Sequence, residues 1–172
     1  MRNKNVGFLV RAALIGAMYA ALTHLQNLLL PGSATWAIQL RVSEALCVLA
    51  LFTPAAIPGL SVGCMVFNLS FAGALPLDAL VGSGATALAA GSMYLLRGVR
   101  VWKLPLPALA MPAIWNALLV GWELTVYVGG GFWLNALYVA AGELIVLLSL
   151  GTVLYTVMKK HKLDLRLFGA AG

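Results

Sequence analysis

Long apolar runs, broken by proline, glycine or charged residues, follow one another along nearly the whole chain. A helix needs about 20 predominantly apolar residues to cross the hydrocarbon core of a bilayer, and runs of this length recur here. We therefore expect an all-α integral membrane protein with six transmembrane helices. Their expected positions are residues 7–30, 38–53, 57–74, 78–97, 105–128 and 133–158.

The boundary between the second and third expected helices is the least regular. Residues 42–74 could form one long tilted helix, but Pro54, Pro58 and Gly59 fall in the middle of it. Proline lacks the N–H that a helix interior needs, so two prolines this close together interrupt the hydrogen-bond ladder. A tight turn between two helices fits this stretch better.

The composition agrees with a membrane location. Of 172 residues, 62% are hydrophobic and 9% are charged, whereas about a quarter of the residues of a typical soluble domain are charged. We expect a single membrane domain over residues 1–172. No G-x-x-x-x-G-K-S/T motif occurs, so we expect no ATP site and no cofactor in this chain.

The basic residues predict the orientation of the helices. With six spans, ten of the eleven lysine and arginine residues fall on one side of the membrane, within residues 2–11, 97–103 and 159–166. Basic residues concentrate on the cytoplasmic side, so we expect both termini in the cytoplasm. Only Arg41 falls outside these groups. The net charge of +6 is then a topology signal rather than a nucleic-acid-binding surface.

Five ionisable residues remain in or near the expected bilayer, where charged groups usually face a cavity or a partner. Glu123 and Glu143 have no basic residue at a comparable depth, which favours a role in ligand binding. Arg41 and Glu44 are three residues apart, so an ion pair between them fits as well as a ligand contact. Asp78 comes just after a proline at an expected helix start, where a capping role fits as well.

Amides and aromatic rings in the same outer half of the bundle indicate the chemistry of a ligand. Asn68 and Asn116 can hydrogen-bond a ligand or join neighbouring helices. Trp36, Trp122 and Tyr138 offer flat faces for stacking, although such rings are also typical of the membrane interface. Carboxylates, amides and rings with few cations indicate an outward-facing pocket for a neutral or cationic, planar, donor-rich small molecule.

Small residues recur every four positions in the first expected helix, at Ala13, Ala17 and Ala21. Such a stripe lets another helix approach closely, because no large side chain holds the two backbones apart. The approaching helix belongs either to the same bundle or to an external membrane subunit.

One short segment has the spacing of a catalytic motif. Residues 59–63, GLSVG, match the nucleophile elbow of hydrolases around Ser61. That motif requires a preceding strand and a histidine in reach, but Ser61 follows Pro58 at a helix start and the last expected helix has no histidine. Cys47 and Cys64 lack the spacing of a metal site or a disulfide framework. We therefore expect neither an enzyme nor a metal centre.

Several segments together resemble a known family. The most distinctive is RVSEALCVLALFTPAAIPGLSVGC, from Arg41 to Cys64. The others are Asn68, Asp78 with 81–90, 116–123 and 136–143. In these segments the chain is similar to the QueT family of queuosine-precursor transporters, and the resemblance extends from about residue 10 to about residue 158.

Resemblance to that family implies a particular architecture and particular partners. It implies the substrate-binding S component of an energy-coupling factor (ECF) importer, a six-helix bundle in a bacterial plasma membrane. A coupling membrane subunit and two ATPase subunits would be separate chains. The stripe of Ala13, Ala17 and Ala21 is similar to the AxxxA motif through which S components dock on the coupling subunit.

The implied ligand is a 7-deazaguanine, either preQ1 or queuine. One carboxylate can accept the ring N–H and the exocyclic amine of such a base, and a second can pair with the aminomethyl cation of preQ1. Glu123 and Glu143 are the candidates for these roles, in either order, with Asp78 as a third. One of the aromatic side chains named above would stack on the ring, and residues 31–39 would serve as a lid.

Other functions stay open at this point. S components share one fold across chemically unrelated ligands, so riboflavin, thiamine or cobalamin is an alternative substrate. A proton-coupled carrier that uses Glu143 and an intramembrane serine hydrolase at Ser61 are weaker alternatives.

Overall fold

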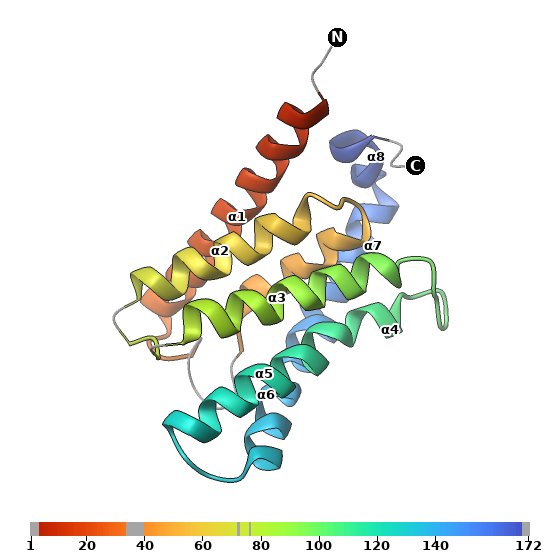
Figure 1. Ribbon diagram of the computed structural model, residues 1–172. Coiled ribbons are helices and arrows are strands. Elements are labelled where there is room, and N and C mark those ends of the chain that lie inside the picture. Colours follow the sequence, from red (N-terminus) through yellow and green to blue (C-terminus); the bar gives the residue numbers. More distant parts are fainter. Residues whose placement is uncertain (1–3, 34–39, 72, 76, 170–172) are drawn as a thin grey trace.

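The computed structural model describes residues 4–33, 40–71, 73–75 and 77–169, which form a bundle of helices (Figure 1). In these residues the only extended pairing is an isolated bridge between Val101 and Leu104. The prediction of an all-α protein is confirmed. The elements are α1 (Lys4–Leu29), the 3-10 helix η1 (Val42–Leu51), α2 (Ala56–Ser70), α3 (Asp78–Leu95), α4 (Leu106–Leu109), α5 (Met111–Tyr127), α6 (Phe132–Val146), the π-helical turn η2 (Leu147–Gly151), α7 (Thr152–Lys160) and α8 (Leu163–Phe168).

All six expected segments contain helix, but the count of six spans is not confirmed. Within the described residues, three helical stretches are long and apolar enough to cross a membrane: Asn5–Leu29, Leu106–Tyr127 and Phe132–Lys160. The second of these joins α4 to α5, and the third is continuous through α6, η2 and α7. These three correspond to the first, fifth and sixth expected helices.

The second and third expected helices are shorter than predicted. η1 has 10 residues in 3-10 geometry and α2 has 15 residues. At the rise per residue of each helix type they reach about 20 Å and about 22 Å, less than the roughly 30 Å of a hydrocarbon core. The break between them falls at the predicted prolines. η1 ends at Leu51, α2 begins at Ala56, and Pro58 stands in the first turn of α2, where its missing N–H has no intrahelical partner to lose.

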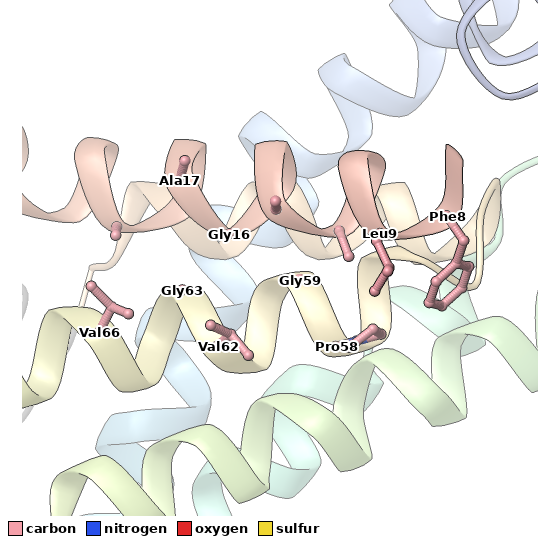
Figure 2. Close-up of a pocket in the computed structure, with 12 residues that line it drawn as sticks. Phe8, Leu9, Gly16, Ala17, Pro58, Gly59, Val62, Gly63 and Val66 are labelled. Carbon is pink, nitrogen blue, oxygen red and sulfur yellow. The ribbon is translucent and has the colours of Figure 1, made fainter. Parts of the chain in front are cut away.

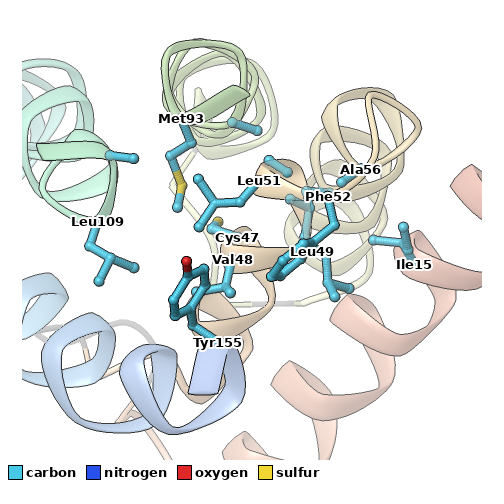
Figure 3. Packing of buried hydrophobic residues seen from close by; sticks show 14 of the residues in the cluster. Ile15, Cys47, Val48, Leu49, Leu51, Phe52, Ala56, Met93, Leu109 and Tyr155 are labelled. Carbon is cyan, nitrogen blue, oxygen red and sulfur yellow. The ribbon is translucent and has the colours of Figure 1, made fainter. Parts of the chain in front are cut away.

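The 3-10 helix η1 lies in the middle of the bundle. Most of its side chains are buried, and it contacts α1, α2, α3, α6, η2 and α7. Around it, α2 packs between α1 and α3, α3 packs against α5, and α5 packs against α6 (Figure 1). Figure 3 shows the apolar core at one end of η1, where Val48 and Leu51 lie among Met93, Leu109 and Tyr155 from α3, α4 and α7.

The start of α1 and the short helix α8 lie at the same end of the bundle, at the top of Figure 1. The guanidinium of Arg11 stands 5.8 Å from the ring centroid of Phe168. Lys159 Nζ donates a 2.7 Å hydrogen bond to Asp164 Oδ2 and so ties α8 to the end of α7. This arrangement fits the expectation that both termini lie on one side of the membrane, and their cytoplasmic location stays a prediction.

Candidate functional site

A cluster of charged side chains is buried between the helices. It contains four acidic residues and one basic residue, and they come from η1, α3, α5, α6 and the residue that precedes η1. Water-accessible charges are common in proteins, but buried ones are costly unless they are paired or serve a ligand. We call this group the buried charge cluster, and its members are Arg41, Glu44, Asp78, Glu123 and Glu143.

Arg41 supplies the positive charge of this cluster. Its side chain is only 7% exposed, and it interacts electrostatically with Glu44, Glu123 and Glu143. One guanidinium nitrogen lies 3.8 Å from Cys64 Sγ. From the sequence we expected no basic residue at the depth of Glu123 and Glu143, and this expectation was wrong. Positions along separate helices place Arg41 away from these acids, but Arg41 lies just before a central helix, and its side chain is close enough to interact with them electrostatically.

Glu44 is held by the protein on both of its oxygens. The hydroxyl of Tyr19 donates to Oε1, and the thiol of Cys47 donates to Oε2 at 3.1 Å. Beside them, Thr23 Oγ1 donates to Ser43 Oγ at 2.7 Å. These contacts fasten the start of η1 to α1, so the protein itself satisfies the carboxylate of Glu44.

Asp78 opens α3 and organises the connection that precedes it. Its Oδ2 accepts a 2.6 Å hydrogen bond from the backbone N–H of Leu75, three residues earlier, so the carboxylate binds the preceding connection and does not cap the amides of α3. Its backbone oxygen accepts a 2.8 Å hydrogen bond from Asn68 Nδ2 of α2. Asp78 also interacts electrostatically with Glu123 across the bundle. The residue therefore joins α2, α3 and α5 at one end of the buried charge cluster.

Glu123 and Glu143 have buried oxygens without donors in the described part of the chain. Glu123 is fully buried, and neither of its oxygens accepts a hydrogen bond. Glu143 is 2% exposed; its Oε1 accepts a 2.8 Å hydrogen bond from Asn116 Nδ2, and its Oε2 accepts none. Asn68 Oδ1 is also buried without a donor. Buried polar atoms nearly always have a partner, so these four acceptor oxygens indicate a place for a molecule that brings donors.

Close backbone packing fixes the two helices that carry these glutamates. A Cβ added at Gly121 would lie 2.9 Å from the Cα of Ala136, so α5 and α6 touch at this point without intervening side chains. Asn116 and Glu123 are seven residues apart and therefore face the same side of α5. On α6, Ala136 and Glu143 are also seven residues apart and face the same side of the helix. Both carboxylates consequently face the interior of the bundle.

The predicted stacking residues lie in less protected positions. Trp122 is 47% exposed and Tyr138 is 38% exposed, on faces of α5 and α6 that turn away from the neighbouring glutamates. Trp36 and residues 34–39 of the expected lid lie outside the described residues. Stacking by these rings stays a prediction. Sequence reasoning missed Tyr19, which is fully buried at the cluster; its spacing of four from Ile15 and Thr23 on one face of α1 was the available signal.

The alanine stripe of α1 faces outward. Ala13, Ala17 and Ala21 are exposed, and Ala13 and Ala17 line a groove of about 570 Å³ between α1 and α2. Figure 2 shows this groove, with Val62 and Val66 of α2 along its other side.

Glycines on the faces where α1 and α2 meet allow the two backbones to touch. A Cβ at Gly59 would lie 2.6 Å from the backbone oxygen of Ala12, and one at Gly63 would lie 2.6 Å from that of Gly16. Internal packing therefore uses Ala12 and Gly16, and the predicted stripe beside them is left on the surface.

Ser61 has the surroundings of a helical serine. Its hydroxyl donates a 2.8 Å hydrogen bond to the backbone oxygen of Ile57, one turn earlier in α2. His24 instead pairs with Ser70, at the other end of α2, with 2.9 Å between His24 Nε2 and Ser70 Oγ. Among the described residues, no histidine is placed to activate Ser61.

A family model described as QueT transporter matches residues 9–160, from the first turns of α1 to the last residue of α7. No curated protein and no solved structure matches the chain. The matched range includes every residue of the buried charge cluster.

Proposed function

Since the chain belongs to the QueT transporter family, we propose that it is the substrate-binding S component of an energy-coupling factor importer in a bacterial plasma membrane. A transporter family favours substrate binding over catalysis. The three long apolar helices support a membrane location.

The observation that carries this proposal is the set of buried oxygens without donors. Glu123, Glu143 and Asn68 together present four of them, and all four are hydrogen-bond acceptors. A ligand that satisfies them must bring several N–H groups, and a positive charge on it would offset the excess of carboxylates over Arg41. A 7-deazaguanine has this chemistry, because its pyrimidine edge carries adjacent N–H donors and preQ1 adds an aminomethyl cation. We propose preQ1 or queuine as the substrate.

The groove on α1 and α2 supports a role for external subunits. We propose that the exposed face of Ala13, Ala17 and Ala21 docks on the coupling membrane subunit, and that two separate ATPase subunits bind and hydrolyse ATP. The groove is apolar and lined by small residues, which lets a partner helix approach closely.

Calorimetric titration of the purified protein in detergent tests the substrate. The ligands would be preQ1, queuine, guanine and riboflavin. Tight binding of a deazaguanine, much weaker binding of guanine and no binding of riboflavin are expected. Binding of riboflavin without any of the purine-like bases would keep the importer architecture and overturn the proposed substrate.

Uptake assays test the dependence on partners. We expect proteoliposomes that contain only this chain to accumulate no labelled preQ1, and those that also contain the coupling and ATPase subunits to accumulate it when ATP is supplied inside. Accumulation by this chain alone, driven by a proton gradient, would instead favour a carrier in which Glu143 exchanges protons.

A further inference from the structure

The two unsatisfied glutamates differ in the number of oxygens they offer. Glu123 has two buried oxygens without a donor, whereas Glu143 has one, because Asn116 already donates to the other. Both side chains are buried, so solvent does not make up this difference. The two carboxylates are therefore suited to different groups on one ligand.

A carboxylate with two free oxygens matches two parallel N–H donors. The ring N–H and the exocyclic amine of a guanine-type base form such a pair, spaced to meet both oxygens of one carboxylate. A carboxylate with a single free oxygen accepts one such donor and leaves the second donor buried and unsatisfied, which is costly. It suits an ammonium group better, because the three N–H donors of an ammonium diverge and only one of them has to meet that oxygen.

We propose, building on the function proposed above, that Glu123 binds the paired N–H edge of the base and Glu143 binds its aminomethyl cation. Asn116 is a positioning residue, which donates to Oε1 of Glu143 and leaves Oε2 as the oxygen without a donor. Asn68 Oδ1 accepts a further N–H on the Glu123 side, since Asn68 is bonded to Asp78 and Asp78 interacts with Glu123.

Three ligands and two isosteric variants separate these roles. The ligands are preQ1, 7-deazaguanine, which lacks the aminomethyl group, and 7-deazahypoxanthine, which also lacks the exocyclic amine. The variants of the full chain are Glu123→Gln and Glu143→Gln, titrated in detergent. Glutamine keeps the size of the side chain but replaces one acceptor oxygen with a donor.

For the wild type, preQ1 should bind about tenfold or more tightly than 7-deazaguanine, because a charge-assisted hydrogen bond contributes roughly that factor. Glu143→Gln should reduce this preference to about threefold or less and leave 7-deazaguanine binding nearly unchanged. Glu123→Gln should weaken both ligands by about 10- to 100-fold and keep the preference for preQ1. Removal of the exocyclic amine should weaken binding to the wild type and matter little in Glu123→Gln.

Glu44→Gln is the matched control for the loss of one negative charge. Because Tyr19 and Cys47 donate to both oxygens of Glu44, this change should act on the ligand only through its charge and lower the preference for preQ1 clearly less than Glu143→Gln does. Thermal unfolding of each variant verifies that it is folded, and Glu123→Asp or Glu143→Asp replaces any variant that is not.

The outcomes distinguish the assignment from the proposed function. If the wild type binds these bases but the effects of Glu123→Gln and Glu143→Gln are exchanged or equal, the assignment is wrong and the proposed substrate stands. If the wild type binds none of the three bases, the proposed substrate itself is wrong and the assignment falls with it.

Discussion

The side-chain nitrogen of Asn116 donates a 2.8 Å hydrogen bond to Glu143 Oε1, across the contact between α5 and α6. Asn116→Ala removes this donor from a buried carboxylate and should destabilise the protein by about 1–3 kcal/mol. The partly exposed Asn135, which bonds to Thr125 and Gly129, is a matched control whose replacement by alanine should cost less. Chemical denaturation in detergent measures both. Equal losses would mean that the Asn116 contact is no stronger than a surface amide contact.

The hydroxyl of Tyr19 gives a second prediction. Tyr19→Phe keeps the ring in the core but deprives Glu44 of a buried donor, so the free energy of unfolding should fall by about 1–3 kcal/mol. Tyr155 is also buried and stacks on Phe52 with 5.7 Å between ring centroids, but no described residue bonds to its hydroxyl. Tyr155→Phe should therefore change stability by less than about 0.5 kcal/mol. If Tyr19→Phe lowers the free energy of unfolding as little as Tyr155→Phe does, the contact between Tyr19 and Glu44 does not hold η1 to α1.

The two faces of α1 should respond differently to enlargement. Ala17→Leu adds a side chain to the outward groove, so ligand binding should persist while copurification with a coupling subunit is lost. Gly16→Ala, one residue away, would place a Cβ 2.7 Å from the backbone oxygen of Gly59 and should destabilise the fold by about 1–3 kcal/mol. Thermal unfolding and pull-down assays read out the two effects. Retained assembly in Ala17→Leu would mean that this face is not the docking surface.

Acid should weaken the attachment of α8. Burial alone would raise the pKa of Asp164, but the hydrogen bond and positive charge of Lys159 together with backbone hydrogen bonds outweigh it, and the pKa of this carboxyl lies below its ordinary value. The stabilisation is thus complete above the pKa of the unfolded chain, about 3.9, and is lost as the pH falls through the lower folded value.

Hydrogen exchange of α8 amides measures this dependence. Protection should drop below about pH 4, once the intrinsic pH dependence of exchange is corrected, and Asp164→Asn should show weak protection at every pH. Ion pairs of this exposed kind contribute about 0.2–1 kcal/mol, so the effect should be confined to α8. A similar pH dependence in Asp164→Asn would assign it to another group.

The turn between α3 and α4 carries backbone strain that a substitution can relieve. Trp102 and Lys103 have φ of 50° and 67°, in the left-handed region, and the flanking Val101 and Leu104 exchange two backbone hydrogen bonds. Glycine adopts this conformation without a steric penalty. Lys103→Gly should raise the free energy of unfolding by about 0.5–1 kcal/mol, measured by chemical denaturation in detergent, and a loss would show that the lysine side chain makes a stabilising contact.

Apolar run length and proline position predicted most of the fold. The extent of the first apolar run gives the approximate ends of α1. Pro54 and Pro58 give the break between η1 and α2, because proline interrupts the helical hydrogen bonds. The 3-10 geometry of η1 does not, because Val42–Leu51 is equally apolar in either helix type and its central position in the bundle decides the outcome. A count of spans from hydropathy therefore assigned a full transmembrane length to a segment that the structure makes shorter.

The sequence indicated which acidic residues lie inside the bundle better than it indicated their contacts, and their role in ligand binding stays a prediction. Glu123 and Glu143 were recognised because isolated acids in apolar helices are costly. The partners Tyr19, Cys47 and Asn116 depend on the rotation of each helix about its axis, which position along the chain does not fix. For the same reason no basic residue was expected at the depth of Glu123 and Glu143, although the side chain of Arg41 is buried and interacts with both.

The glycine contacts between α1 and α2 also bear on how the molecule deforms. Two helices separated by side chains can slide, because the side chains change rotamer, but α1 and α2 touch through backbone atoms at Gly16, Gly59 and Gly63. A force on the outer surface of α1 is thus transmitted directly to α2, because no side chains that could change rotamer separate the two backbones. Asn68, which holds one of the buried acceptors, lies further along the same helix, so the rigid contact and this acceptor share α2.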